Sequence, residues 1–241
     1  MQRLPLFYKR VVPLSKQQHK NLYVEPVPGY AFARETNSVY IAAIEFVPVA
    51  REYPIVFATT GEEGVVLPVA LLGIRNNQNL FVAADGSWKA KYIPAYVRRY
   101  PFILATDSAG RFTVCIDEAY PGFNTVREGE RLLAENGDEG PLLKRSVEFL
   151  KDYQQHVTRT TAFCKLLVDF KLLEPVQANI ALKGGEKFAL TGLNCVNRSR
   201  LKALADADLA ALARQDYLEL IYLHLQSLAN MDGLLALMSG Q

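Results

Sequence analysis

Cysteine, histidine and tryptophan are scarce in this chain of 241 residues, which has three cysteines, three histidines and one tryptophan. The cysteines are odd in number and stand 49 and 31 residues apart, at Cys115, Cys164 and Cys195, so neither a disulfide framework nor a CxxC metal knuckle fits. The histidines are widely separated and form no HxD, HxE or HExxH pattern. We therefore predict no metal site and no cofactor.

The chain also lacks a strong charge of either sign and a long uninterrupted apolar run. Its 27 Lys and Arg and 25 Asp and Glu give a net charge of +2, which argues against a nucleic-acid partner. The most apolar long segment, 217–238, contains Glu219, His224 and Asp232, so it is better explained as a buried helix than as a membrane span. No apolar stretch of signal-peptide length stands at the N-terminus. We expect a protein without a membrane span, in the cytoplasm by default.

Half of the residues are hydrophobic, which is enough for a large core and excludes a disordered chain. Short runs rich in β-branched and aromatic residues predict strands at 55–58, 65–72, 80–83, 102–106 and 111–117. Residues 107–110 end in Gly110 and predict a hairpin turn between the last two runs. Segment 38–46 fits a strand or a short helix, and we favour a strand.

The pattern changes to helix after Gly122. A long helix is predicted to begin near Pro141 and to be stopped by Pro175, and a hairpin at 176–190, turning at Gly184 and Gly185, is expected to extend the first sheet. Three helices follow, beginning near 198, 206 and 217, and the last has Asp216 and Glu219 in the spacing of a capping box. The prediction is an α+β fold in one domain, 1–241, with a β-rich part at 1–120 and a mainly helical part at 121–241.

The densest group of aromatic and basic residues lies between Trp88 and Phe102, where Pro94 and Pro101 frame one or two helical turns. Aromatic faces beside guanidinium groups can stack planar ligands or clamp a carboxylate or phosphate. The candidate residues for binding a ligand or partner are Trp88, Tyr92, Tyr96, Arg98, Arg99 and Tyr100 in this segment, together with His224 near the C-terminus. The alternative is a buried aromatic plug whose arginines pair with carboxylates of the same chain. Arg99 shares a helix face with Tyr96, so we expect Arg99 to turn inward to a carboxylate and Arg98 to face solvent or a ligand.

The histidines suggest less. His224 and Ser227 share one face of the last helix, but no carboxylate stands at a helical neighbour of His224, which favours a packed histidine sharing a proton with a backbone carbonyl. His156 has Asp152 one turn before it and predicts a surface ion pair, while His19 lies in a polar stretch and is expected to be solvated. No catalytic residue is assigned. An enzyme that acts on an aromatic or carboxylated small molecule, with Tyr96, Tyr100 or His224 as proton donor, stays open as the alternative to a binding protein.

Four stretches of the sequence resemble the motifs of a known family. They are the Tyr-x-Pro-Ala and Arg-Arg-Tyr-Pro-Phe run within 88–102, Val-Cys-Ile-Asp at 114–117, Leu-Thr-Gly-Leu at 190–193 and His-Leu-Gln-Ser-Leu-Ala-Asn at 224–230. Together they resemble the bacterial SapC family. The family's residues after the Leu-x-Gly motif are often acidic, whereas this chain has Asn-Arg-Ser-Arg at 197–200. The peptide-transporter permease of the same name is a different, membrane-spanning protein.

The resemblance covers the chain from about residue 22 onward and carries over no catalytic residue. It implies a non-enzymatic binding or assembly protein with a protein partner or self-association, and the candidate site adds an aromatic or anionic small molecule. The family name comes from association with a surface layer, which would need export without a cleaved signal. A second implication is an accessory role beside TonB-dependent receptors and halogenase-like proteins.

Overall fold

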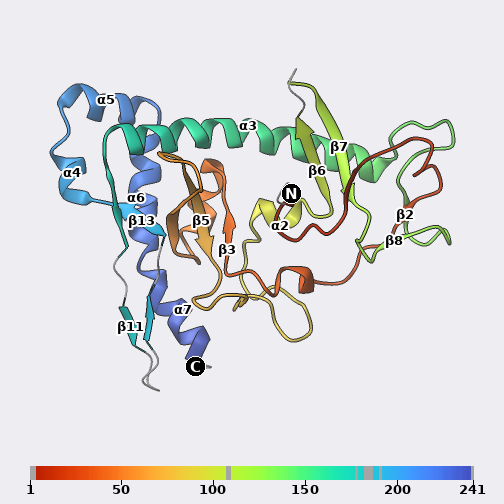
Figure 1. Cartoon of the computed structure of the whole chain (residues 1–241), viewed down its shortest axis with the longest axis horizontal. Coiled ribbons are helices and arrows are strands. Elements are labelled where there is room, and N and C mark those ends of the chain that lie inside the picture. The colour runs from red at the N-terminus through yellow and green to blue at the C-terminus, as the bar shows by residue number, and fades with distance from the viewer. Residues whose placement is uncertain (1–3, 107–109, 177–178, 182–186, 190–191, 240–241) are drawn as a thin grey trace.

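The computed structural model describes residues 4–106, 110–176, 179–181, 187–189 and 192–239 (Figure 1). Its helices are α1 (Phe46–Val49), α2 (Ala95–Arg98), α3 (Pro141–Asp169), α4 (Arg198–Lys202), α5 (Asp206–Arg214), α6 (Tyr217–Ser227) and α7 (Asn230–Ser239), with the short 3-10 helices η1 (Ala31–Ala33) and η2 (Ala43–Glu45). Among these described helices, none combines the length and the apolar character needed to cross a membrane.

The strands form four sheets, and every described pair of strands is antiparallel. The largest has the order β10 (Leu173–Pro175), β13 (Leu193–Val196), β4 (Ile55–Thr59), β5 (Val66–Leu71) and β3 (Ser38–Tyr40). The second has the order β1 (Val11–Pro13), β7 (Phe112–Asp117) and β6 (Phe102–Thr106). The small sheets are β8 (Phe123–Asn124), β2 (Tyr23–Val24) and β9 (Glu130–Arg131), and β11 (Asn179–Ala181) with β12 (Lys187–Ala189). The predicted α+β fold with antiparallel sheets is confirmed.

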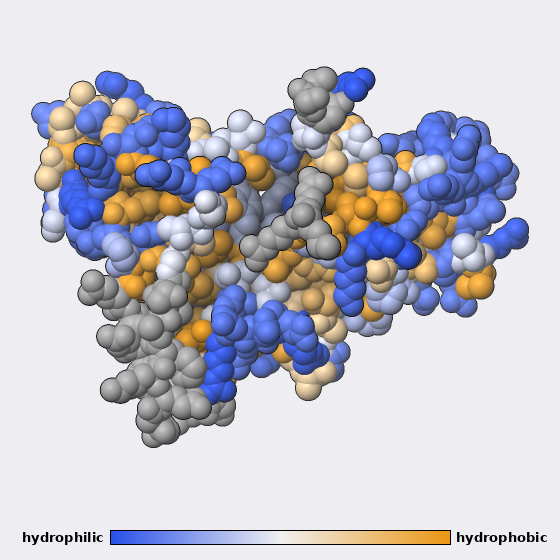
Figure 2. Space-filling view, in the orientation of Figure 1, coloured by the Kyte–Doolittle hydropathy of each residue, from blue (hydrophilic) through white to orange (hydrophobic). Residues whose placement is uncertain are grey.

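Helix α3 runs along one side of the molecule, past the five-stranded sheet at one end and past β6 and β7 at the other (Figure 1). Near its beginning, Leu143 and Leu150 are buried in a cluster with Phe102 and Ile116. Near its end, Phe163 is buried in the larger cluster, which is built on the five-stranded sheet. The helix therefore links two hydrophobic cores. Figure 2 shows a hydrophobic surface beside β6 and β7, next to a hydrophilic end that is formed by β2, β8 and the loops around them.

The end of α3 differs from the prediction. The helix ends at Asp169, and Lys171 takes a left-handed backbone conformation with φ 52°. This turn redirects the chain into β10, where Pro175 pairs with Asn194 of β13. Proline therefore stands in an edge strand instead of stopping the helix, and it can do so because an edge strand does not need its N–H.

The β-structure after α3 was only partly predicted. β11 and β12 pair as a hairpin, but they form a sheet of their own, so the expectation that they extend the first sheet is wrong. The turn at Gly184 and Gly185 lies outside the described residues. The strand that does extend the large sheet is β13, which pairs with β4. Its short run, Leu193–Val196, has too little periodicity to stand out in the sequence.

Two strand predictions in the first half fail as well. Segment 38–46 is a strand only up to Tyr40, and Glu45 then closes a 3-10 turn by accepting a hydrogen bond from the Ala42 N–H. Segment 80–83 makes a single isolated bridge, between Val82 and Trp88, because its backbone bonds go to neighbouring loops. The hairpin of β6 and β7 is confirmed, and Gly110 has the expected positive φ, although residues 107–109 lie outside the described part.

The predicted helix starts near 198, 206 and 217 are confirmed, but the expectation of one helix over 217–238 is wrong, because α6 ends at Ser227 and α7 begins at Asn230. The predicted caps are confirmed only in part. Asn197 caps α4 by accepting a hydrogen bond from the Arg200 N–H. Asp216 precedes α6 as predicted, but it has φ 60° and its side chain makes no capping bond, so the capping box with Glu219 is wrong. An aspartate tolerates this left-handed conformation better than most residues, and it turns the chain between α5 and α6.

Candidate ligand-binding site

The site is built around the short helix α2, which Pro94 precedes as its N-terminal cap. Ala95 and Val97 face the interior, while Arg98 and Arg99 leave the helix at its other end. The Ala95 N–H donates to Glu45 Oε1 over 2.7 Å, which fixes the start of α2 against η2. The sequence therefore holds this turn in place through a carboxylate that stands 50 residues earlier.

Glu45 is a buried carboxylate that the sequence reading missed. It accepts hydrogen bonds from the N–H of Ala42, the N–H of Ala95 and the Tyr92 hydroxyl. Burial raises the pKa of its carboxyl above the usual value, and the backbone hydrogen bonds oppose that shift. Its position between apolar residues, at 41–49, is the one signal that could have suggested a buried role.

The two arginines lie against aromatic rings of α3. The guanidinium carbon of Arg98 is 5.1 Å from the ring centre of Phe149, and that of Arg99 is 5.5 Å from Tyr153 and 3.8 Å from Tyr96. Phe149 and Tyr153 stand one helical turn apart, and their rings are stacked at 6.4 Å with 20° between their planes. Neighbouring guanidinium groups are thus placed on consecutive rings of one helix face.

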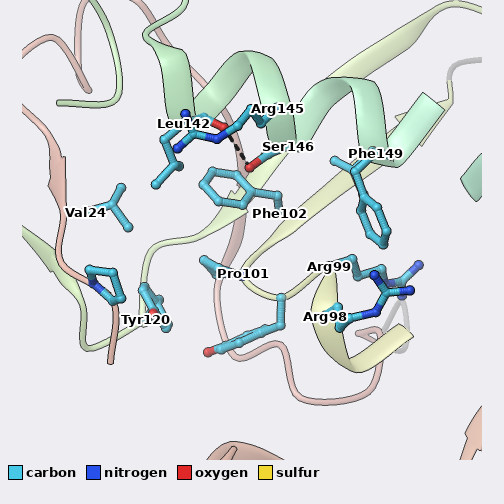
Figure 3. Close-up of a pocket in the computed structure, with 13 residues that line it drawn as sticks. Val24, Arg98, Arg99, Pro101, Phe102, Tyr120, Leu142, Arg145, Ser146 and Phe149 are labelled. Atoms are coloured by element: carbon cyan, nitrogen blue, oxygen red, sulfur yellow. Dashed lines mark hydrogen bonds between the residues drawn. The ribbon is translucent and has the colours of Figure 1, made fainter. Parts of the chain in front are cut away.

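A hollow of about 350 Å³ opens between α2, α3 and the end of β6. We call it the arginine pocket. It is lined by 13 residues, among them Arg98, Arg99, Tyr100, Arg145, Ser146 and Phe149. Figure 3 shows Arg98 and Arg99 below Phe149, and Arg145 on the α3 side with Phe102 and Pro101 between them. The lining contains three arginines and no carboxylate.

The three arginines differ in their bonding. Arg145 pairs with Glu130 over 2.9 Å, and Arg98 Nε donates to the Ile93 carbonyl over 3.0 Å. Within the described part of the chain, no carboxylate lies at ion-pair distance from Arg99, and its buried Nε has no hydrogen-bond partner. The expectation that the inward arginine pairs with a carboxylate is wrong, since Glu45 is already bonded to backbone amides and a tyrosine.

Tyr100 is fixed at the edge of the pocket. Its hydroxyl donates to Asp117 Oδ2 over 3.1 Å, and burial raises the tyrosine pKa above its usual value. Asp117 is fully buried and also accepts hydrogen bonds from the backbone N–H groups of Lys9 and Arg10. One carboxylate therefore holds the N-terminal segment and a wall of the pocket together, a role that nothing in the sequence predicted.

Trp88 and Tyr92 lie beside the pocket but do not line it. The indole Nε1–H of Trp88 donates to the Tyr53 hydroxyl over 2.8 Å, and its ring stacks on Phe81 with 17° between the planes. Tyr92 is bonded to Glu45. These two candidates support the α2 region from the core side, and Tyr96 carries Arg99 on its ring.

His224 lies in another part of the core, in contact with β4 and β13. Its Nδ1–H donates to the Ile55 carbonyl over 2.8 Å, and its Nε2 accepts from the Val196 N–H over 3.0 Å. Ser227 Oγ accepts from the Ile55 N–H and donates to the His224 carbonyl. Burial lowers the pKa of His224 to about 4. Both ring nitrogens are occupied, which is the packed histidine that the sequence favoured.

The remaining histidines and metal-ligating groups add no site. His156 lies 3.5 Å from Asp152, as predicted. His19 is buried instead of solvated, because its ring accepts from the Ser15 N–H and donates to Glu118. Across the described ranges, no cluster of three or more His, Cys, Asp or Glu side chains is placed to hold a metal ion.

Comparison with protein families identifies the family of this chain. The family model described as SapC covers residues 14–234, which is nearly the whole chain. The comparisons with curated proteins and with solved structures found no match.

Proposed function

We propose a binding role for this protein, which belongs to the SapC family. The proposed ligand is a small anion with an aromatic or apolar body, held in the arginine pocket. The observation that supports this most directly is the pair Arg98 and Arg99, two adjacent cations that lie over Phe149 and Tyr153 of α3 and that have no carboxylate at ion-pair distance among the described residues.

The physical argument starts from charge. A guanidinium group with an unbonded, buried N–H is costly unless an acceptor is supplied, and two neighbouring guanidinium groups repel each other. A carboxylate or phosphate relieves both costs, since its oxygens match the planar fork of an arginine in pairs. The apolar lining, with Phe102, Phe149 and Pro101, suits a ring or another flat apolar group attached to that anion.

Binding rather than catalysis is proposed because of what the pocket presents. Ser146 Oγ donates to the Leu142 carbonyl, and the Tyr100 hydroxyl donates to Asp117, so neither is a free nucleophile or proton donor. His224 has both ring nitrogens bonded to the backbone. Tyr96, the remaining proton donor that the sequence suggested, does not line the arginine pocket. These residues therefore favour a binding site over the alternative of an enzyme that acts on an aromatic or carboxylated molecule.

Titration calorimetry with phenyl phosphate, benzoate, inorganic phosphate and cyclohexanecarboxylate tests the proposal. We expect an aromatic anion to bind more tightly than inorganic phosphate, and Arg99→Gln to weaken it about tenfold or more. Arg10→Gln is the matched control, because Arg10 is 66% exposed and pairs with Glu118 away from the pocket. No binding of any of the four compounds, or equal binding by Arg99→Gln, would reject this ligand class.

The setting of this role is the second part of the proposal. The family supports assembly with a protein partner or with other copies, at a surface layer or beside outer-membrane receptors. Fractionation of cells that produce the native protein separates these settings. Recovery from the cytosol alone removes the surface-layer setting and leaves the accessory one, while recovery at the cell surface removes the cytoplasmic location expected by default.

A further inference from the structure

The arginine pocket adjoins two further hollows. The second hollow, of about 220 Å³, shares Arg98 with the arginine pocket. The third hollow, of about 390 Å³, shares Gly29 and Phe32 with the second hollow. Tyr100 and Tyr120 line all three. The second hollow therefore lies between the other two, and we call the three together the tyrosine groove.

Aromatic rings divide the tyrosine groove into slots. Tyr100 packs edge-to-face against Tyr120 at 5.5 Å and lies 4.4 Å from Phe32, which in turn meets the edge of Phe7 at 5.3 Å. A series of rings with hollows between them is a surface that takes consecutive side chains of an extended chain, as in grooves that bind proline-containing segments.

The rim of the groove is held in place. The Val27 N–H donates to the Tyr120 hydroxyl over 3.2 Å, and the Tyr30 N–H donates to the Gly86 carbonyl over 2.7 Å. Gly29 has φ 82°, and a Cβ on it would stand 2.6 Å from the Gly86 oxygen. The backbone approach at Gly29 needs glycine, so the rim is prepared before any ligand arrives.

The charges of the groove are unbalanced in one direction. Its three hollows are lined by Arg98, Arg99 and Arg145 at one end and by Lys9, Arg34 and Glu35 at the other. Because Arg145 is already paired with Glu130, four cations remain against one carboxylate. This excess selects an acidic partner. Because the far hollow ends in charged side chains, a long acyl chain would lose its apolar surroundings there, whereas a polypeptide brings polar backbone groups.

We propose that the tyrosine groove binds an extended segment of another polypeptide, with an acidic side chain or C-terminal carboxylate against Arg98 and Arg99. The residues next to that acid, apolar or proline, occupy the slots between Tyr100, Tyr120 and Phe32. This inference rests on the proposed function, since the same two arginines bind the anion. It names the ligand class as a peptide, and the small aromatic anion of the proposed function then resembles one part of that peptide.

Fluorescence anisotropy of labelled nine-residue peptides tests the inference. The peptides carry one Glu or a free C-terminus, with Pro, Leu or Phe at the other positions, and each has a twin with Gln or an amidated end. Phenyl phosphate and laurate are measured beside them. The variants are Arg99→Gln in the arginine pocket and Phe32→Ala in the far hollow, with binding of phenyl phosphate as the check that Phe32→Ala is folded.

Support requires that acidic peptides bind about tenfold or more tightly than their neutral twins, and that Arg99→Gln weakens both the peptides and phenyl phosphate. Phe32→Ala should weaken the peptides about fivefold or more and leave phenyl phosphate unchanged. A second variant avoids the core: Val27→Glu adds a carboxylate at the exposed rim, with Val126→Glu, at 69% exposure, as its matched control.

Four results overturn the inference, and only the last of them also rejects the proposed function. Binding of phenyl phosphate without binding of any peptide rejects the peptide and leaves the proposed function standing. If the peptides bind Phe32→Ala and Val27→Glu as tightly as the wild type, the tyrosine groove is not the peptide-binding site. Binding of laurate but of no acidic peptide reassigns the groove to an acyl chain. If the wild-type protein binds none of these compounds, phenyl phosphate included, the proposed function itself is rejected.

Discussion

The two parts of the molecule that the sequence singled out, the surroundings of His224 and of Arg99, treat a polar side chain in opposite ways. His224 has no solvent exposure, and each of its ring nitrogens has a backbone partner. Arg99 is half-buried and stacks on Tyr96, but its buried Nε has no partner. Full bonding marks a residue that holds strands and helix together, and missing bonds mark the place where a ligand can supply them.

The bonding around His224 also explains why its neighbour is a serine. Ser227 accepts from the Ile55 N–H and His224 donates to the Ile55 carbonyl, so both backbone groups of this first residue of β4 are bonded to side chains of α6. Side chains of α6 thus make hydrogen bonds to the sheet backbone that a neighbouring strand would otherwise make. Among the residues that the structure describes, no carboxylate or carbonyl accepts from the Arg99 Nε–H, although Glu45 and Asp117 are buried in the same region and bonded elsewhere.

The largest expected effect on stability comes from removing the fully hydrogen-bonded side chain of His224. His224→Ala leaves the Ile55 carbonyl and the Val196 N–H without partners and opens a cavity, which should lower the free energy of unfolding by about 3–5 kcal/mol. Urea denaturation measures it. Ser227→Ala is the graded control, with one orphaned N–H and a loss of about 1–3 kcal/mol. A loss below about 1 kcal/mol in His224→Ala would contradict the structural role.

The same histidine should make stability depend on pH. The unfolded ring takes up a proton near its ordinary pKa of 6.5, while the folded ring stays neutral down to about 4, so the unfolded state binds more protons between these values. Stability should therefore fall as the pH falls from 6.5 towards 4, by up to about 3 kcal/mol.

Two measurements isolate this pH effect. NMR of the His224 ring should show the neutral form at pH 5. The raised pKa of Glu45 acts in the opposite sense on stability, so the difference between wild type and His224→Gln, in which Glu45 is unchanged, reports the histidine alone. Identical pH dependence in the two proteins would refute the assignment.

On the open side, Arg99→Ala should have a smaller effect on folding than on binding. Loss of its stacking on Tyr96 and Tyr153 is expected to cost about 1–2 kcal/mol, far below the about 3–5 kcal/mol of a broken buried ion pair. Thermal melts with and without phenyl phosphate check this, because the wild type should be stabilised by the ligand and the variant should not. A loss of 3 kcal/mol or more without ligand would show that Arg99 has a charged partner after all.

The smallest effect is expected at Arg98. This arginine is exposed, makes one hydrogen bond to the Ile93 carbonyl and lies over Phe149, so Arg98→Ala should change stability by less than about 0.5 kcal/mol. Binding of phenyl phosphate should nevertheless weaken. Equal losses of stability in the two arginine variants would remove the distinction between an inner and an outer arginine.

Local patterns predicted the elements better than their partners. The hairpin of β6 and β7 and the long helix α3 follow from turn chemistry and from apolar spacing, which act between near neighbours. The pairing of β13 with β4 joins residues more than 130 positions apart, and no local pattern in the sequence indicates that these two strands pair. Asp216 shows the same limit, because the helix start was correct and the capping bond was not.

The candidate site divides in the same way. Arg98, Arg99 and Tyr100 were adjacent in the sequence and line one pocket. The opposite wall, with Ser146 and Phe149 from α3, could not be foreseen because the contact depends on how α3 crosses β6. The two carboxylates that fix the site, Glu45 and Asp117, looked ordinary in the sequence, since burial is a property of the folded chain.

Helix α3 also decides where this protein can be divided. A fragment cut at 140, directly before α3, would lose Leu143, Val147 and Leu150 from the core around Phe102. The complementary fragment would keep Phe163 and Leu167 without the strands that cover them. Neither fragment contains a complete interior, so we expect both to fail as separate expression units and to recover structure only when they are produced together.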